Sequence, residues 1–167
     1  MSKNHKRYFI KGREAKELFQ KASKRLNKDL EAIFGAKASV ELVEINSHKI
    51  FLINGKPALF EAEKNLYPTL FFEEVISSMP KTVMDIGAVP HVCNGANVMA
   101  PGIVRLEGKF KKGDFVVVVD ENYGKPLAVG EVLYDDEVAR EVRQGAVVKN
   151  VHYVGDKVWK SIRELHR

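Results

Sequence analysis

A run of small residues is the part of the sequence best suited to bind a ligand. The stretch from Gly95 to Gly102 reads G-A-N-V-M-A-P-G. Small side chains leave the backbone accessible, so the bases or backbone of a ligand can come close to it. Unstacked nucleotides of a single strand or an RNA end offer edges that such a surface can contact. The same composition also fits an ordinary tight crossover from a helix to a strand.

The residues before this run predict a short helix that positions it. Asp85 follows the apolar run 82–84 and is a suitable N-cap, because its carboxylate can accept from free amides of the first turn. Asn94-Gly95 is expected to end the helix, since both residues enter left-handed conformations at low cost. The apolar residues between them recur at helical spacing and predict one buried face: Ile86, Val89, Val92 and Cys93.

The sequence gives no sign of a metal site, a cofactor or a catalytic centre. Cys93 is the only cysteine, which excludes a disulfide framework and a cysteine zinc site and suits a reducing cytoplasm. His91 and Cys93 are two residues apart and therefore point to different faces of a helix. The five histidines are scattered and show no metal-ligand spacing. We expect Cys93 to be a buried, inert thiol.

Positive charge is concentrated at the N-terminus. The net charge is +5, but residues 1–28 carry seven Lys and three Arg against two Glu, a net +8. Apolar residues between 13 and 28 form a narrow helical stripe, and basic residues occupy the rest of the circumference. This face is either simply solvated or contacts a polyanion; a membrane surface is disfavoured because no large apolar face accompanies it. We predict phosphate contacts by Arg13, Lys16, Lys21, Lys24, Arg25 and Lys28.

The periodicity predicts an α+β protein of two domains. In residues 1–80, a strand at 6–11, helices at 13–28 and 30–34, three strands within 40–63 and a helix at 68–79 are expected. Asn54-Gly55 is a strong hairpin signal. In residues 81–156, strands are expected at 103–106, 115–120, 126–133 and 146–154, with a helix capped by Asp135. Residues 157–167 form a tail helix capped by Asp156. No apolar run approaches the roughly 20 residues of a membrane span, and no secretory signal is seen, so we expect a soluble cytoplasmic protein.

Three segments carry a resemblance to known proteins. Gly87–Ile103 reads G-A-x-x-x-V-x-x-G-A-N-V-M-A-P-G-I, which resembles the signature of the PUA domain, a small RNA-binding barrel. Leu66–Leu70 and the segment from Gln144 to Trp159 are similar to the malignant T-cell-amplified sequence protein family. That family joins a pre-PUA domain to a PUA domain. The resemblance implies an α+β pre-PUA domain, with helices on a small antiparallel sheet, followed by a PUA pseudo-β-barrel.

The resemblance also implies where RNA binds. In PUA proteins a groove lies between the helix and loop on one side and the last strand of the barrel on the other. At Pro90 several relatives carry Lys, so this chain lacks a positive charge there. The implied RNA-binding residues are Gly87, His91, Asn94, Gly95, Ala96, Asn97, Met99, Ala100, Pro101 and Gly102, with Lys149, Asn150, His152 and Tyr153 on the opposite wall.

The function that follows is non-catalytic RNA binding related to translation. The resemblance implies a tRNA 3′ end, such as its CCA, or ribosomal RNA as the ligand. It implies the small ribosomal subunit and a density-regulated-protein-like protein as partners. The alternative is an RNA-modification enzyme or an RNA-binding accessory subunit of one, although the N-terminal 80 residues show no acid-nucleophile constellation or cofactor loop. A third alternative is a structural adaptor without RNA affinity.

Overall fold

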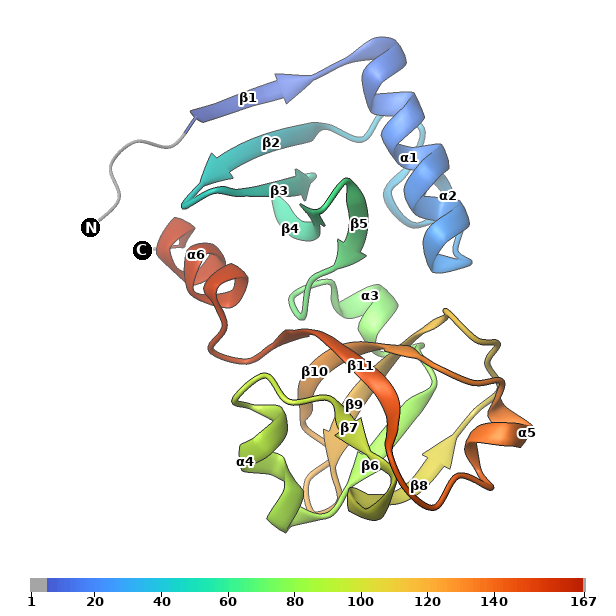
Figure 1. The fold of residues 1–167 in the computed structure, drawn as a ribbon. Coiled ribbons are helices and arrows are strands. Elements are labelled where there is room, and N and C mark those ends of the chain that lie inside the picture. Colours follow the sequence, from blue (N-terminus) through green and yellow to red (C-terminus); the bar gives the residue numbers. More distant parts are fainter. Residues whose placement is uncertain (1–5, 167) are drawn as a thin grey trace.

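The computed structural model describes residues 6–166, which form two packed α+β units (Figure 1). The N-terminal unit is an antiparallel sheet with helices on it, and the C-terminal unit is a curled sheet that forms a half-barrel. This confirms the predicted fold class. Residues 1–5 and Arg167, the last residue of the predicted tail helix, lie outside the described residues.

The N-terminal sheet is a five-stranded antiparallel meander. Its strands follow the order of the chain, and turns at Asn46-Ser47 and Asn54-Gly55 join β2 to β3 and β3 to β4 with positive φ angles. The predicted hairpin at Asn54-Gly55 is confirmed. The strands are β1 (Lys6–Ile10), β2 (Val40–Ile45), β3 (His48–Ile53), β4 (Lys56–Ala62) and β5 (Asn65–Pro68).

The fifth strand, β5, was not predicted from the sequence. The turn before it places Glu63 and Lys64 at φ 51° and 67°, and neither residue type usually signals such a turn. Pro68 therefore ends a strand, and the predicted helix over 68–79 is wrong except for one turn, α3 (Glu73–Ile76). The buried hydroxyl of Thr69 donates to the carbonyl of Pro57 at 3.1 Å, which holds the chain after β5 against β4.

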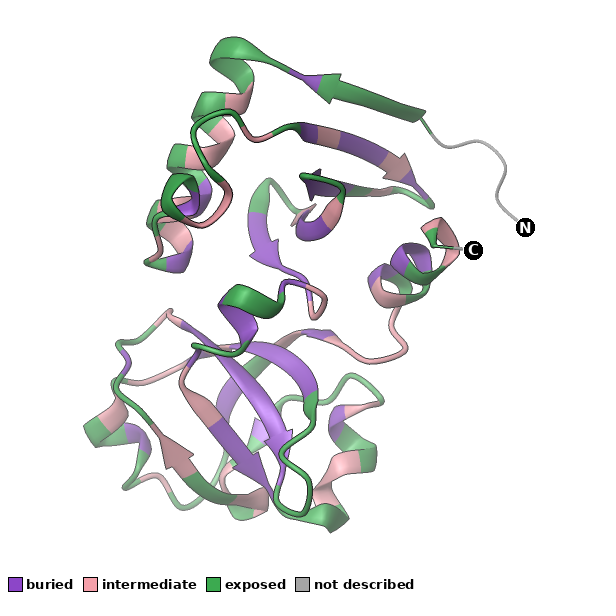
Figure 2. Ribbon diagram, turned by 180° about the vertical axis from the view of Figure 1, so that it is seen from behind, coloured by how far each residue is buried: buried purple, intermediate pink, exposed green. Residues whose placement is uncertain are grey.

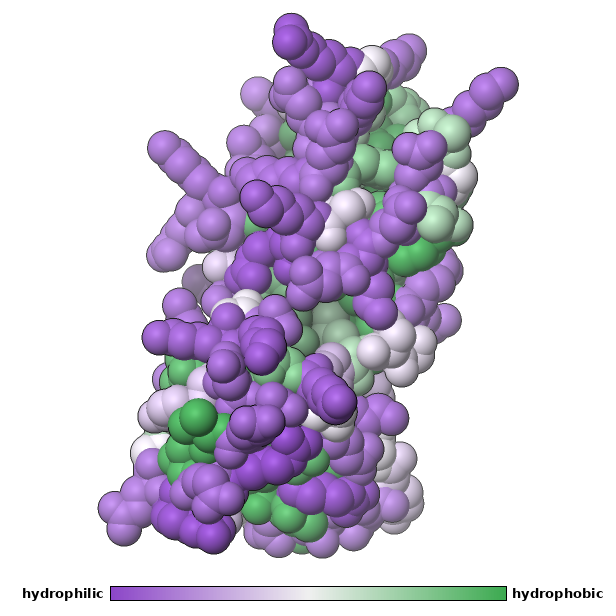
Figure 3. Space-filling view, turned by 90° about the vertical axis from the view of Figure 1, so that its right-hand side faces the viewer, coloured by the Kyte–Doolittle hydropathy of each residue, from purple (hydrophilic) through white to green (hydrophobic). Residues whose placement is uncertain are grey.

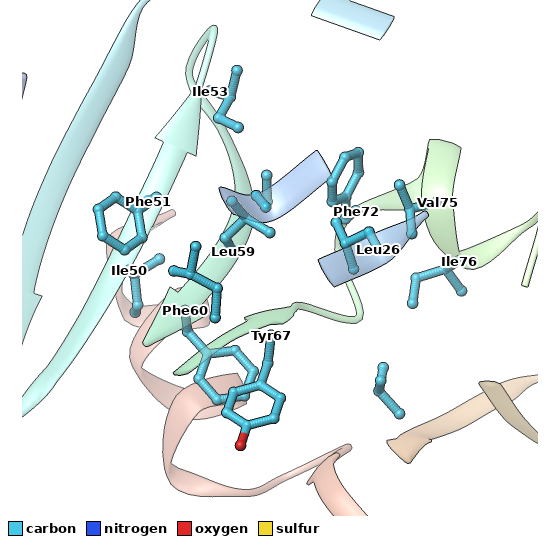
Figure 4. Packing of buried hydrophobic residues seen from close by; sticks show 14 of the residues in the cluster. Leu26, Ile50, Phe51, Ile53, Leu59, Phe60, Tyr67, Phe72, Val75 and Ile76 are labelled. Atoms are coloured by element: carbon cyan, nitrogen blue, oxygen red, sulfur yellow. The ribbon is translucent and has the colours of Figure 1, made fainter. Parts of the chain in front are cut away.

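Two helices pack on this sheet as the periodicity predicted. They are α1 (Gly12–Leu26) and α2 (Leu30–Phe34), and the carboxylate of Asp29 caps α2 by accepting from the amides of residues 31 and 32. Leu26 and Leu30 are buried in a core whose aromatic members include Phe60, Tyr67 and Phe72 (Figure 4). The outer face of α1 stays exposed (Figure 2).

The C-terminal unit curls a six-stranded sheet around its own core. Its order is β7-β11-β10-β9-β6-β8, with β6 and β9 parallel and the other pairs antiparallel. All six residues of β9 are buried, as the continuous apolar run predicted. The strands are β6 (Lys81–Met84), β7 (Val98–Met99), β8 (Ile103–Glu107), β9 (Phe115–Asp120), β10 (Pro126–Val132) and β11 (Ala146–Tyr153).

One glycine permits the tight curl of this sheet. A side chain at Gly130 in β10 would overlap Val148 of the neighbouring strand, so only glycine fits there. The β10–β11 register also shifts between Val129 and Gly130. Two short helices, α4 (Val89–Val92) and α5 (Asp136–Ala139), flank the sheet. Asp135 makes no side-chain cap on α5; its carboxylate accepts from the amide of Lys112 at 2.8 Å instead, which corrects the predicted cap.

The last helix, α6 (Lys157–Leu165), returns from the barrel to the N-terminal unit (Figure 1). Asp156 caps it as predicted, accepting from the amide of Trp159 at 2.8 Å. Its buried side chains, Val158 and Ile162, join the core of the N-terminal sheet. The same core includes Phe115 of β9, so the two units share one continuous apolar cluster. No helix within residues 6–166 is long and apolar enough to cross a membrane.

Candidate nucleic-acid interface

Hydrogen bonds fasten the segment from Asp85 to Gly102, which contains the small-residue loop. The amide of Asp85 donates to the carbonyl of Gly102 at 2.9 Å, which closes the loop at its base. The carboxylates of Asp85 and Glu121 accept from the amides of Gly87 and Ile86, both at 3.1 Å. The N-cap predicted at Asp85 is therefore confirmed, although it caps a 3₁₀ turn (Ile86–Ala88) that precedes α4.

The predicted buried face of this helix is mostly wrong. Val92 is buried, but Ile86 is 51% exposed and Val89 and Cys93 are only half-buried. The helix is too short to present a continuous face, since α4 spans only one turn. Burial raises the pKa of the Cys93 thiol, which keeps it protonated and unreactive near neutral pH. Within the described residues, no group of three or more His, Cys, Asp or Glu could hold a metal ion.

Two asparagines clamp the loop directly onto β11. The side-chain amide of Asn150 donates to the carbonyls of Val92 and Ala96, both at 3.0 Å. The side-chain oxygen of Asn97 accepts from the amide of Asn150 at 3.0 Å. The loop and β11 therefore touch one another at this clamp, rather than facing each other across an open groove there. Asn97 and Asn150 position the loop, a role that no local sequence signal indicates.

Two glycines of the loop allow close packing inside the protein. Gly95 has φ 95°, and a Cβ there would lie 3.2 Å from the hydroxyl of Tyr153. A Cβ at Gly102 would lie 2.9 Å from that of Ala88. The fold itself therefore favours glycine at these two positions.

Most of the predicted residues gather on one surface, which we call the loop face. Ala100, Gly102, Asn150 and Tyr153 are half-buried at its edge or base. Its only lysine or arginine is Lys149, so charge contributes little here. The exposed members are Gly87, His91, Asn94, Gly95, Ala96, Asn97, Met99, Pro101 and Lys149.

His152 does not belong to the loop face. Its side chain is 0% exposed, and its ring packs edge-on against Phe60 with centroids 5.2 Å apart. Its Nδ1 lies 2.9 Å from the carboxylate of Asp156. The prediction that His152 lines an RNA groove is therefore wrong, because the ring is buried between the two units.

Asp156 is the acidic partner at this junction. Burial alone would raise the pKa of Asp156, but the hydrogen bond and charge of His152 and the amides of Trp159 and Tyr153 outweigh it and lower that pKa. The carboxylate is therefore held ionised while it caps α6 and fixes the end of β11.

The predicted phosphate-contacting residues form a second surface on α1, which we call the basic face. Arg13, Lys16, Lys21 and Lys24 are exposed, and Lys28 is half-buried just after the helix. The Arg13–Glu17 pair, at 3.4 Å between highly exposed side chains, leaves Arg13 largely solvated.

Arg25 serves a different purpose from its neighbours. Its guanidinium lies 4.1 Å from the ring centroid of Phe115, donates to the carbonyl of Gly113 at 3.0 Å and pairs with Glu131 at 3.3 Å. These partners all belong to the C-terminal unit. Arg25 therefore joins the two units, which corrects the prediction of a phosphate contact.

The loop face and the basic face lie on opposite sides of the molecule. In Figure 1, α4 is at the lower left and α1 at the upper right, and Figure 2 shows the same separation from behind. One RNA molecule that contacts both the loop face and the basic face must therefore extend around the protein, or contact the two faces with different parts of its chain.

The fold and the loop define a class, since residues 80–154 match the PUA domain family. Residues 6–72 match a second family, described as a domain of unknown function (DUF1947). A solved PUA-domain structure from Aeropyrum pernix K1, a tartrate complex, superposes with a TM-score of 0.84 at 27% identity, covering 98% of this chain and 94% of that one.

Relatives that match most of the chain identify the family. The protein MJ1432 of Methanocaldococcus jannaschii is 37% identical over 157 residues, covering 92% of this chain and 95% of that protein. Translation machinery-associated protein 20 of Schizosaccharomyces pombe is 30% identical, covering 69% and 67%. Malignant T-cell-amplified sequence 1 of Rattus norvegicus is 29% identical, covering 78% and 75%. The chain belongs to this family of PUA-domain proteins, as the sequence resemblance predicted.

Proposed function

We propose that this protein is a non-catalytic RNA-binding protein of translation. The loop face would hold the unpaired 3′ end of a tRNA, and the basic face would contact phosphates of tRNA or ribosomal RNA. The observation that carries the proposal is a rigid, exposed surface of small residues on a PUA domain, clamped by Asn97 and Asn150. The name of the Schizosaccharomyces pombe relative, which associates that protein with the translation machinery, supports the same function.

The chemistry of the loop face suits an RNA end better than a duplex. Exposed small residues such as Gly95 and Ala96 let unstacked bases approach the backbone. The ring of Tyr153, half-buried against Gly95, is an aromatic surface beside that path. A continuous A-form duplex would instead present mainly hydroxyls and phosphates, for which this nearly uncharged surface offers few partners.

The small number of charges on the loop face implies that affinity comes from elsewhere. The family resemblance implies Lys in several relatives at the position of Pro90, so this chain lacks that charge, and Lys149 is the one lysine of the loop face. Lysines bind phosphates without reading sequence, so the basic face would supply affinity and position the RNA. We propose the small ribosomal subunit and a density-regulated-protein-like protein as the partners in whose presence this occurs.

The test compares intact tRNA with tRNA that lacks its CCA terminus. Base stacking contributes about 1–3 kcal/mol per base, so trimming should weaken binding tenfold or more. The double variant Ala96→Glu, Met99→Glu places two carboxylates on the loop face and should abolish this preference. The matched control, Tyr123→Glu, Val138→Glu, changes two exposed residues elsewhere on the same unit and should preserve it. Equal affinity of the parent protein for intact and trimmed tRNA would exclude end recognition.

A further inference from the structure

A cleft of about 440 Å³ lies where the two units meet. One wall is the end of α1 and the residues just after it, and the other is formed by the start of β6 and the loop after β8. Two hydrogen bonds fix its width: Arg25 donates to the carbonyl of Gly113 at 3.0 Å, and Asn27 donates to the carboxylate of Asp114 at 3.3 Å. The cleft is therefore a property of the docked pair of units.

Three lysines from the two units line this cleft. Lys28 comes from the N-terminal unit and Lys81 and Lys109 from the C-terminal unit. Among the residues that the structure describes, none of the three ammonium groups has an ion-pair partner. Three like charges that line one hollow favour an anion between them.

The two acids of the cleft offset only part of the positive charge of its lining. Glu107 pairs with Arg105 at 2.6 Å. Asp114 accepts from the amide of Lys111 at 2.9 Å as well as from Asn27. Asp114 keeps its negative charge, because both of its donors are neutral. The four cations that line the cleft, one arginine and the three lysines, still outnumber its two carboxylates and leave the lining a net charge of 4 − 2 = +2.

A second hollow of about 450 Å³ continues the positive surface beyond this bridge. It is lined by Lys21 and Lys24 of α1 and by Lys112 of the C-terminal unit. It shares Arg25, Asn27 and Asp114 with the first cleft. Hydrophilic side chains cover most of this side of the molecule, over both units (Figure 3).

The helix dipole explains only part of this arrangement. Lys24 lies in the last turn of α1, where a cation stabilises the helix C-terminus. Lys81 and Lys109 belong to a strand and a loop of the other unit, so the dipole gives no reason for their convergence on the same hollow. A shared polyanionic ligand does.

We propose that the cleft between the units binds phosphate groups of an RNA backbone through Lys28, Lys81 and Lys109. It extends the basic face, to which Lys28 belongs, onto the C-terminal unit, on the side of the molecule opposite the loop face, and it requires both units in their docked positions. Its volume accommodates a phosphate-bearing nucleotide unit. The inference rests on the proposed RNA-binding function and names a surface of both units that performs it.

The test removes the three charges and compares a charge-matched control. The cleft variant is Lys28→Gln, Lys81→Gln, Lys109→Gln in the full chain. The control is Lys49→Gln, Lys125→Gln, Lys160→Gln, which changes the net charge equally at exposed sites outside the cleft. Binding is measured against intact and CCA-trimmed tRNA over a range of salt concentrations, and against ATP as a free phosphate-bearing ligand.

We expect the cleft variant to lose the same affinity for intact tRNA and for tRNA that lacks its CCA terminus. The cleft variant should bind both tRNAs about tenfold more weakly than the control at moderate salt, with the intact-to-trimmed ratio unchanged. The magnitude of its slope of log affinity against log salt should fall by about 2–3, since each of three phosphate contacts contributes roughly 0.7–0.9. Because Lys109 is exposed, Lys109→Glu against Lys125→Glu gives the same comparison with little risk to folding.

Three results separate failure of this inference from failure of the proposed function. Equal slopes and affinities for cleft and control variants would overturn the cleft site while leaving end recognition intact. Loss of ATP binding with unchanged tRNA binding would show a free-nucleotide site and overturn the RNA assignment. If the parent protein binds no tRNA at all, the proposed function itself fails.

Discussion

The loop face and the basic side of the junction are built in opposite ways. The loop face is nearly uncharged and is held by side chains that bond to backbone, with Asn150 as the central clamp. The basic side comprises the basic face of α1 and the cleft between the units. Its lysines lie on solvated surfaces, and the contacts of Arg25 with the C-terminal unit hold the two units together there. The difference indicates a division of labour: one surface discriminates by shape, and the other supplies affinity by charge. Substitutions on the loop face should therefore change the preference for an RNA end, whereas substitutions on the basic side should change overall affinity and its dependence on salt.

The largest effect is expected from Asn150→Ala on the loop side. It removes the two hydrogen bonds that the Asn150 side chain donates to the carbonyls of Val92 and Ala96, each of which contributes about 0.5–1.5 kcal/mol. Within the described part of the chain, the Val92 carbonyl then keeps only the amide of Gly95 as a donor. Urea unfolding should show this loss, and preference for intact over trimmed tRNA should disappear. The neighbouring exposed residue gives the control, since Lys149→Ala should change stability by less than about 0.5 kcal/mol. An Asn150→Ala protein with parental stability and end preference would show that the loop needs no clamp.

Asp156→Ala tests the junction between β11 and α6. It should lower the free energy of unfolding by about 2 kcal/mol, because it removes the helix cap on the amide of Trp159 and the hydrogen bond from the amide of Tyr153. The effect should depend on pH. The folded-state pKa of Asp156 is lowered, so its contribution is complete above the unfolded value of about 3.9 and is lost as pH falls through the folded pKa. Unfolding of parent and variant at pH 7 and near pH 3 checks this. A stability difference as large at pH 3 as at pH 7 would contradict the role of the ionised carboxylate.

A smaller loss, about 1–2 kcal/mol, is expected from Arg25→Lys. An ammonium cannot reproduce the guanidinium that lies over Phe115 while it bonds to Gly113 and Glu131. The substitution conserves charge, so any loss of tRNA affinity would arise from looser docking of the two units. Arg13→Lys, at a position 92% exposed, is the matched control and should change neither stability nor binding. Identical unfolding curves for the two variants would show that the Arg25 guanidinium does not stabilise the junction between the units.

The smallest effect on stability is expected on the outer face of α1. Replacing Lys16, Lys21 and Lys24 by Gln should alter the free energy of unfolding by no more than about 0.5 kcal/mol. The same variant should reduce the salt slope of RNA binding by up to about 0.7 for each lost single-strand phosphate contact. The reduction should be alike for different RNA sequences, because phosphate contacts carry no sequence information. An unchanged slope would show that these lysines are only solvated.

Local signals in the sequence predicted much of the fold. Asn54-Gly55 indicated its hairpin, Asp156 its helix cap and the run 115–120 its buried strand, because each depends on neighbouring residues alone. β5 was missed because Glu63-Lys64 adopts a turn that its residue types do not signal. The division into domains at 80/81 and 156/157 stays a prediction. The contacts of α6 with the first unit lead us to propose that the tail helix completes that unit.

The site was predictable only in outline. Small residues and the PUA resemblance located the loop, but the roles of Asn150, His152 and Arg25 depend on partners far away in the chain. His152 and Tyr153 are adjacent in β11, yet one is buried at the junction and the other lies beside Gly95. Arg25 follows Lys24 in a basic helix but turns toward Phe115. Residues that are adjacent in the chain thus have different roles because of tertiary packing, which the local sequence does not indicate.

The division of labour is tested most directly by the ratio of affinities for intact and CCA-trimmed tRNA, measured as a function of salt. Absolute affinities should fall steeply as salt rises, because the lysines release counterions. The ratio should stay tenfold or more and nearly constant. Lys149 is the one lysine on the loop face, so recognition of the RNA end depends little on salt. A ratio near one at every salt concentration, or one that collapses as salt rises, would contradict the account.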